Sequence, residues 1–139
     1  MKIMFAYPLT AAVTLLSMLV YIWMMTRVGA ARGRHEVPAP LMTGPDEFNR
    51  VLRVQENTME TLILFLPVLW LYALTISDLY AAAIGVFFPI GRVLYALGYY
   101  AASDKRGRGF MIGFVATIIL LVGSIIGTGQ ILWSQYYIG

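Results

Sequence analysis

The sequence contains no cysteine, a single histidine and few charged residues, and each shortage excludes a class of function. Without cysteine the chain has no disulfide, no thiolate nucleophile and no cysteine-ligated metal, so any reacting sulfur must come with a substrate. His35 has no second ligand at a metal-binding spacing, and no motif for a metal, haem or nucleic-acid partner is present. Charged residues form 12% of the chain, about half the fraction usual in soluble domains, and 60% of residues are hydrophobic. This balance predicts an integral membrane protein.

Four stretches of the sequence are apolar enough, and long enough, to cross a bilayer, which takes about 20 helical residues. We expect one domain over residues 1–139, with spans at about 4–26, 58–77, 79–101 and 109–134. Pro67 and Pro89 fall inside the second and third spans and predict a kink in each, which membrane helices tolerate. The expected fold is all-α, a multi-pass integral membrane four-helix bundle.

Two basic segments separate these spans. Arg27–Phe48 holds three prolines and predicts a loop, with Thr43 or Gly44 capping the helix that follows. Ser103–Arg108 predicts a second, tight basic loop. Four spans place both loops on one side of the membrane, and the positive-inside rule predicts that this side is the cytoplasm.

A line of polar residues marks the point where the second span enters apolar surroundings. Arg53, Asn57 and Glu60 recur at i, i+4 and i+7, so they share one helix face. They suit a small zwitterion, with a cation for its carboxylate and an anion for its ammonium. The alternative is an ion pair that holds this helix to a neighbour. Gln55 points about 200° away from Arg53 and serves either a neighbouring subunit's pocket or a bond to another helix.

A second line of residues lies on the third span, where Arg92, Tyr95 and Tyr99 follow at i, i+3 and i+7. The two hydroxyls either donate to a bound polar ligand or belong to an aromatic stripe that packs on neighbouring helices. Arg92 lies deeper in the span and requires an acceptor, for which Glu60, Asp78 or a backbone carbonyl would serve.

The remaining basic residues lie near the membrane surface. Positive-inside charge and lipid-headgroup contacts account for most of them. An arginine at this depth beside a thiol would also lower the pKa of that thiol by stabilising its anion. These residues are Arg32, Arg34, Lys105, Arg106 and Arg108.

Two stretches carry a resemblance to a known family: TGPDEFNRVLRVQENTMETLILFLPVLW at residues 43–70 and GRVLYALGYYAASDKRGRG at residues 91–109. The chain resembles the MAPEG family, the membrane-associated proteins in eicosanoid and glutathione metabolism, over nearly its whole length. Within that family it is most similar to the branch of leukotriene C4 synthase and microsomal glutathione transferases types 2 and 3. Two positions depart from the family's pattern. Thr61 stands where an aromatic residue is frequent, and Gly33 stands where leukotriene C4 synthase has an arginine.

The resemblance implies a homotrimer that binds glutathione between neighbouring subunits on the cytoplasmic side. One subunit would line the site with Arg53, Asn57, Glu60, Tyr95 and Tyr99. The adjacent subunit would contribute Arg32, Gln55 and Arg106, of which Arg106 would stabilise the thiolate.

The implied activity is that of a glutathione transferase, with glutathione as co-substrate and no metal. It would conjugate glutathione to lipophilic electrophiles that enter from the bilayer, or reduce lipid hydroperoxides. Two other functions stay open: a non-enzymatic lipid-binding adaptor, as in one branch of the family, and a small transporter subunit. The second is disfavoured because Arg92 is the one charge deep within a span.

Overall fold

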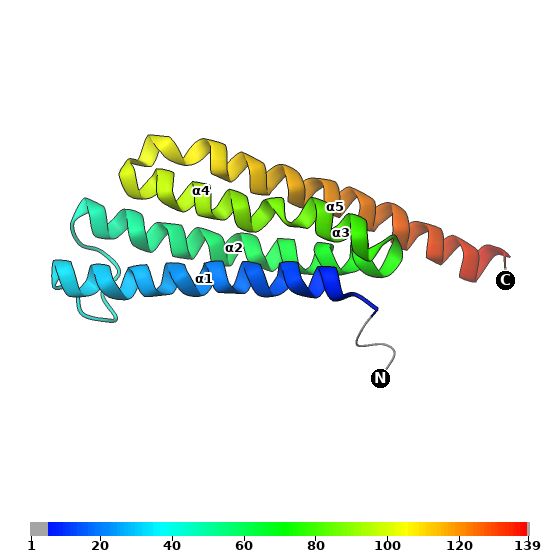
Figure 1. The fold of residues 1–139 in the computed structure, drawn as a ribbon, viewed down its shortest axis with the longest axis horizontal. Coiled ribbons are helices and arrows are strands. Elements are labelled where there is room, and N and C mark those ends of the chain that lie inside the picture. The colour runs from blue at the N-terminus through cyan, green and yellow to red at the C-terminus, as the bar shows by residue number, and fades with distance from the viewer. Residues whose placement is uncertain (1–5, 139) are drawn as a thin grey trace.

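The computed structural model describes residues 6–138, and all regular structure within them is helical. The helices are α1 (Pro8–His35), α2 (Asp46–Thr75), α3 (Asp78–Gly85), α4 (Phe87–Ala101) and α5 (Gly107–Trp133). A 3₁₀ turn, η2 (Ser103–Arg106), precedes α5, and a π-helical turn, η3 (Ser134–Ile138), follows it. Figure 1 shows the α1–α2 loop and the α4–α5 turn at one end of the bundle, with the start of α1 and the end of α5 toward the other.

The surface of the bundle is that of a membrane protein. Within the described residues, four helical stretches are long and apolar enough to span a bilayer, with α3 and α4 together forming the third. Large apolar side chains lie on the outside, among them Leu19, Ile63 and Ile125, which are 62%, 72% and 63% exposed. Such side chains are stable facing lipid and would promote aggregation in water. Residues 4 and 5 of the first expected span lie outside the described range.

The first helix is longer than expected. Arg27–His35 is helical, so the prediction of a loop from Arg27 is wrong over these residues. The segment contains no proline, and basic side chains in the last turn of a helix interact favourably with its dipole. The helix ends at Glu36, whose φ of 53° is left-handed and whose N–H bonds to the carbonyl of Arg32.

The start of α2 also differs from the prediction. Pro45 occupies the N-cap position and no side chain caps the helix there, so the expected cap by Thr43 or Gly44 is wrong. The side chain of Asn49 instead accepts from the N–H of Gly44 and donates to its carbonyl, both at 2.9 Å. These two bonds anchor the end of the loop on the first turn of α2, which then continues through Pro67.

The third span is two helices rather than one kinked helix. α3 ends at Gly85 and α4 begins at Phe87. The break falls where Pro89 supplies no N–H to the carbonyl of Gly85 and its ring crowds that carbonyl. Just after the break, Phe88 stacks on Phe65 of α2, with ring centroids 3.9 Å apart and planes 6° from parallel.

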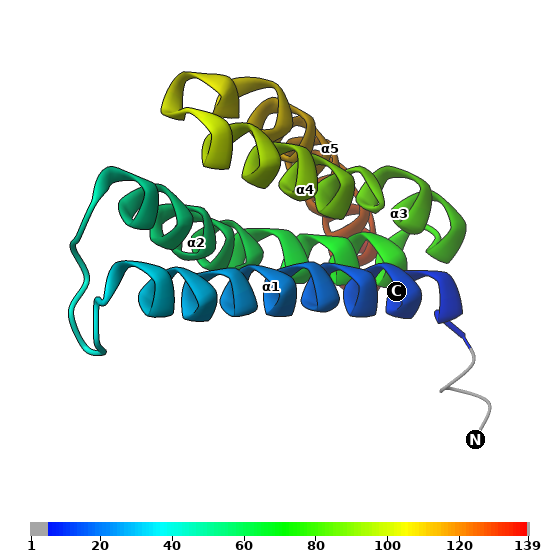
Figure 2. The same ribbon diagram turned by 60° about the vertical axis from the view of Figure 1, so that its left-hand side comes forward.

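Glycines bring α4 and α5 into backbone contact. A Cβ atom on Gly91 would lie 2.8 Å from the carbonyl oxygen of Gly109, and one on Gly109 would overlap the backbone nitrogen of Tyr95. Small residues allow this close approach between membrane helices. Figure 2 shows α4 and α5 as one layer, α1 and α2 as another, and the two layers diverging toward the loop end.

Side-chain hydrogen bonds link the helices through the apolar interior. Trp70 of α2 donates to Thr14 of α1 at 3.0 Å, and Ser124 of α5 donates to the carbonyl of Val68 at 2.9 Å. Ser17 and other hydroxyls donate to carbonyls four residues earlier in their own helix. In a membrane these bonds satisfy groups that lipid cannot solvate.

Asp78, the first residue of α3, caps α1 from a distant position in the chain. Its carboxylate accepts from the backbone N–H groups of Leu9 and Thr10 at 3.2 and 2.8 Å. These N–H groups lie in the first turn of α1, where helical partners are lacking and negative charge is favourable. The interaction fixes the start of the first span against the start of the third.

Asp78→Ala is expected to lower the free energy of unfolding by about 1 kcal/mol, the usual effect of losing a helix cap. Asp78→Asn keeps one oxygen acceptor and should lose less. Denaturant titration in mixed micelles would measure both, with Asp104→Ala as the control that removes a carboxylate at the loop end. Equal stability of the wild type and Asp78→Ala would show that the cap contributes nothing.

Candidate functional site

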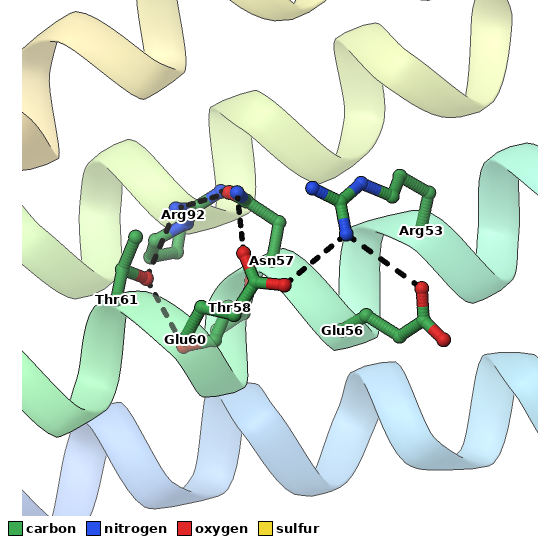
Figure 3. Close-up of polar contacts among 7 residues, drawn as sticks. All are labelled: Arg53, Glu56, Asn57, Thr58, Glu60, Thr61 and Arg92. Carbon is green, nitrogen blue, oxygen red and sulfur yellow. Dashed lines mark hydrogen bonds and ion pairs between the residues drawn. The ribbon is translucent and has the colours of Figure 1, made fainter.

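The polar face of α2 forms a chain of contacts among its own side chains. Arg53 Nη1 lies 3.2 Å from Glu60 Oε1 and 3.7 Å from a carboxylate oxygen of Glu56 (Figure 3). Asn57 Nδ2 lies 3.5 Å from the second oxygen of Glu60. The side chains of Arg53 and Glu60 are about half exposed, so both groups of this ion pair remain open to a ligand.

Asn57 also contacts the neighbouring helix. Both terminal nitrogens of Arg92 lie 3.1 Å from Asn57 Oδ1, and Arg92 Nη1 lies 3.2 Å from Thr61 Oγ1 (Figure 3). The guanidinium also sits 3.9 Å from the centre of the Tyr95 ring. The prediction that Glu60, Asp78 or a backbone carbonyl accepts from Arg92 is therefore wrong, since an amide and a hydroxyl of α2 do so.

The aromatic residues of α4 form the opposite wall. Tyr95 is buried and packs edge-on against Tyr99, with ring centroids 5.6 Å apart. Arg106, at the end of η2, places its guanidinium 5.3 Å from the centre of the Tyr99 ring and donates to the carbonyl of Ser103 at 2.8 Å. The turn after α4 therefore brings the Arg106 guanidinium back against the Tyr99 ring of α4.

These residues surround a single cavity of about 240 Å³. Its lining consists of Arg53, Asn57, Tyr95, Tyr99, Arg106 and Phe110. Two cations, an amide and two phenols therefore face one space near the loop end of the bundle. Phe110 was not predicted as a site residue, because nothing in the sequence distinguishes it from other apolar residues of the fourth span.

Two further hollows adjoin this cavity. The deeper one shares Asn57 and Phe110 with it and adds Glu60 and Arg92 to apolar walls that include Phe114. The outer one opens toward the loops and shares Arg53 and Tyr99 with it. Its other lining residues are Met42, Thr43, Asp46, Asn49, Arg50, Leu52, Glu56 and Ser103. The three hollows form a path from a polar mouth to an apolar interior.

Arg32 and Gln55 lie apart from the cavity within one chain. Arg32 Nη1 donates to the carbonyl of Leu41 at 2.7 Å and so holds the α1–α2 loop. Gln55 Nε2 donates to the hydroxyl of Tyr21 on α1 at 2.8 Å. The structure thus brings together five of the eight residues predicted for the site around one cavity and joins Glu60 to them through Arg53 and Asn57.

The charged side chains in and beside the cavity can bind several kinds of chemical group. Guanidinium groups bind carboxylates, a carboxylate binds an ammonium group, and a cation beside an ionisable acid stabilises its anion. No group of three or more His, Asp or Glu residues suited to a metal ion occurs among residues 6–138. The cavity thus offers two guanidinium groups to anions, Glu60 adjoins it with a carboxylate, and the deeper hollow adds apolar walls.

Four apolar helical spans around a polar cavity define the class: an integral membrane protein of the helical-bundle type with a candidate small-molecule site. The chain belongs to the MAPEG family, whose model matches residues 10–126. This agrees with the resemblance seen in the sequence.

Comparison with individual relatives indicates which members of the family the chain is similar to. The chain is 44% identical to an uncharacterised protein of Synechocystis sp. over 124 residues, which cover 89% of this chain and 88% of that one. It is 34% identical to microsomal glutathione S-transferase 2 of Mus musculus, with coverage of 92% and 87%. It is 38% identical to leukotriene C4 synthase of Rattus norvegicus, with coverage of 70% and 65%. The last two relatives represent the branch expected from the sequence.

Proposed function

We propose that the protein is a membrane-bound glutathione transferase, which conjugates glutathione to lipophilic electrophiles or reduces lipid hydroperoxides. The observation that carries this proposal is the cavity in which Arg53, Asn57, Tyr95, Tyr99 and Arg106 meet beside an apolar recess. Similarity to a microsomal glutathione S-transferase over 92% of the chain supports the choice of ligand.

The charges around the cavity complement those of glutathione, which carries two carboxylates, one ammonium group and a thiol. Arg53 would bind a carboxylate and Glu60 the ammonium group, so the ligand would replace the ion pair that these two side chains now form. Asn57 and the hydroxyls of Tyr95 and Tyr99 would bond to the peptide's polar groups. These groups come from α2 and α4.

A second subunit would complete the site in a homotrimer. Arg32 and Gln55 project away from the cavity of their own chain, and both would contact glutathione bound against a neighbour. Arg32 would then bind the second carboxylate of glutathione. The site would lie on the cytoplasmic side. The positive-inside rule supports this, because both basic loops lie at the same end of the bundle (Figure 1).

Arg106 would activate the sulfur. A guanidinium beside the thiol favours its anion and lowers the pKa of the glutathione thiol, so no protein base is required. The thiolate would attack the electrophilic carbon of an epoxide or an activated alkene and form a carbon–sulfur bond. The carbon–oxygen bond or the carbon–carbon π bond would break, and the resulting anion would take a proton from water. With a hydroperoxide it would attack the terminal oxygen, and a second glutathione would then yield glutathione disulfide, an alcohol and water.

The second substrate would approach from the bilayer along α1 and α5. Apolar and aromatic side chains of the deeper recess, among them Leu64, Phe88 and Phe114, lie next to the cavity on the side away from the loops. Lipid-soluble electrophiles are concentrated in the membrane, and this recess would receive them there.

Titration of glutathione onto the detergent-purified protein near neutral pH is expected to produce a saturable ultraviolet difference absorbance of the thiolate. The reason is that free glutathione remains mostly protonated at this pH, whereas glutathione beside Arg106 does not. S-methyl glutathione, which has no ionisable thiol, is the control ligand and should bind without the signal.

Two outcomes would contradict parts of the proposal. Saturable binding without the thiolate absorbance would show that glutathione is bound but not activated. Absence of binding would overturn the transferase assignment and favour the lipid-binding adaptor instead.

A further inference from the structure

Arg92 is the largest fully buried side chain among the described residues, and the site as outlined so far gives it no role. It is 2% exposed and lies on α4, inside the third span. A buried cation is unfavourable in a membrane unless it is well bonded. None of the four ion pairs found among residues 6–138 includes it, so its bonds to neutral groups must hold it in place.

Two of the hydrogen bonds of Arg92 converge on one atom of the candidate site. Both terminal nitrogens of Arg92 lie 3.1 Å from Asn57 Oδ1, which gives a forked contact to a single carbonyl oxygen. A third bond runs to Thr61 at 3.2 Å, and the ring of Tyr95 covers the guanidinium at 3.9 Å. Figure 3 shows the guanidinium reaching the amide from α4 while Glu60 approaches it from the other side.

The forked contact from Arg92 determines which end of the Asn57 amide faces the cavity. An asparagine side chain accepts at one end and donates at the other, and the two orientations have nearly the same shape. With Oδ1 held by two donors, Nδ2 must point toward Glu60 and the cavity, where it lies 3.5 Å from a carboxylate oxygen. The reverse orientation would direct the NH₂ group at a guanidinium, which offers no acceptor. The positive charge also polarises the amide and strengthens Nδ2 as a donor.

We propose that Arg92 is a positioning residue of the glutathione site, which acts through the amide of Asn57 and does not contact the ligand. This inference rests on the proposed function, since it concerns how the site holds glutathione. The roles of two arginines then separate. Arg92 governs the affinity for glutathione, whereas Arg106 governs the ionisation of its sulfur.

Arg92→Lys is expected to raise the glutathione dissociation constant by about tenfold, the order expected when one charged hydrogen bond is lost or misaligned. A lysine retains the charge but supplies a point donor in place of the fork. At saturating glutathione the thiolate absorbance and kcat should equal those of the wild type, and only the KM for glutathione should rise. Calorimetric titration and the ultraviolet assay measure the two quantities, with Arg108→Lys as a matched control.

A double-variant comparison separates this role from a general structural one. If Arg92 acts through Asn57, then Asn57→Leu and Asn57→Leu combined with Arg92→Met should bind glutathione within about twofold of each other, the usual error of additivity. The double variant removes both polar partners together, so it leaves neither of them buried and unpaired. It therefore decides the question even where Arg92→Lys does not fold.

Each result has one reading. Wild-type affinity in Arg92→Lys would overturn the proposal, and so would a further tenfold loss in the double variant beyond Asn57→Leu. A loss of thiolate absorbance at saturating glutathione would assign Arg92 to activation instead. Failure of the proposed function is distinguishable from all of these, because the wild-type protein itself would then bind no glutathione.

Discussion

Arg106→Ala is expected to remove the thiolate absorbance of bound glutathione and to lower kcat by about 100-fold or more, the usual effect of deleting one group that stabilises an anionic reacting atom. The guanidinium lines the cavity and is held by the carbonyl of Ser103 and the ring of Tyr99. Its removal leaves no other cation of η2 among the lining residues. The dissociation constant for glutathione should change far less than kcat, because the groups proposed to bind the peptide remain.

The matched control is Arg108→Ala, which makes the same change in charge at the second residue of α5 and leaves the cavity lining intact. Thiolate absorbance and conjugation of a lipophilic electrophile would be measured side by side. Full activity of Arg106→Ala with an unchanged pKa of the bound thiol would disprove the role given to this residue.

Gly109→Ala is expected to destabilise the fold by about 3 kcal/mol, at the upper end of typical overpacking effects, or to prevent folding. A methyl group there would overlap the backbone of Tyr95 and lie 2.6 Å from the carbonyl oxygen of Gly91. Backbone atoms cannot rotate away as the end of a side chain can, so α4 and α5 would have to separate. Folded yield, elution volume in detergent and the midpoint of thermal unfolding would record the loss.

Gly129→Ala is the control on the same helix, because a Cβ atom there meets nothing within 4 Å. Alanine favours the helix by up to about 1 kcal/mol over glycine, so this variant should be as stable as the wild type or more so. Equal stability of the two variants would show that α4 and α5 tolerate separation. Any Gly109→Ala protein that does fold should also bind glutathione poorly, since its α4 wall would be displaced.

The spans were predictable from the sequence because their signal is local. Long uncharged runs require a membrane wherever they pack, and the two prolines of the second and third spans were visible in advance. The ends of the helices were less predictable. The prediction of a loop over Arg27–Phe48 rests on its three prolines, all of which lie after His35. Nothing within Arg27–His35 ends the helix, and the left-handed Glu36 that does is not a glycine.

For the candidate site too, the features that depend on local spacing were predictable, and those that depend on contacts between helices were not. The one-face arrangement of Arg53, Asn57 and Glu60 follows from helical spacing, and the structure shows the contacts that such spacing allows. The acceptors of Arg92 lie 35 and 31 residues away, on another helix, and no local pattern specifies them. The position of Phe110 in the cavity is likewise set by how α5 packs on α4.

The divergence of the two helix layers has a mechanical consequence. Toward the membrane interior the layers are held together by the Phe65–Phe88 stack and the forked contact of Arg92, while toward the loops they spread apart (Figure 2). Because α4 and α5 are joined backbone to backbone, they behave as one rigid arm. A small change in the angle between the layers would therefore change the width of the mouth more than the packing around the aromatic stack. Near the loops, Trp23 and Arg27 of α1 both contact the Tyr100 ring of α4, so the width of the mouth depends on these contacts rather than on the apolar packing beneath it.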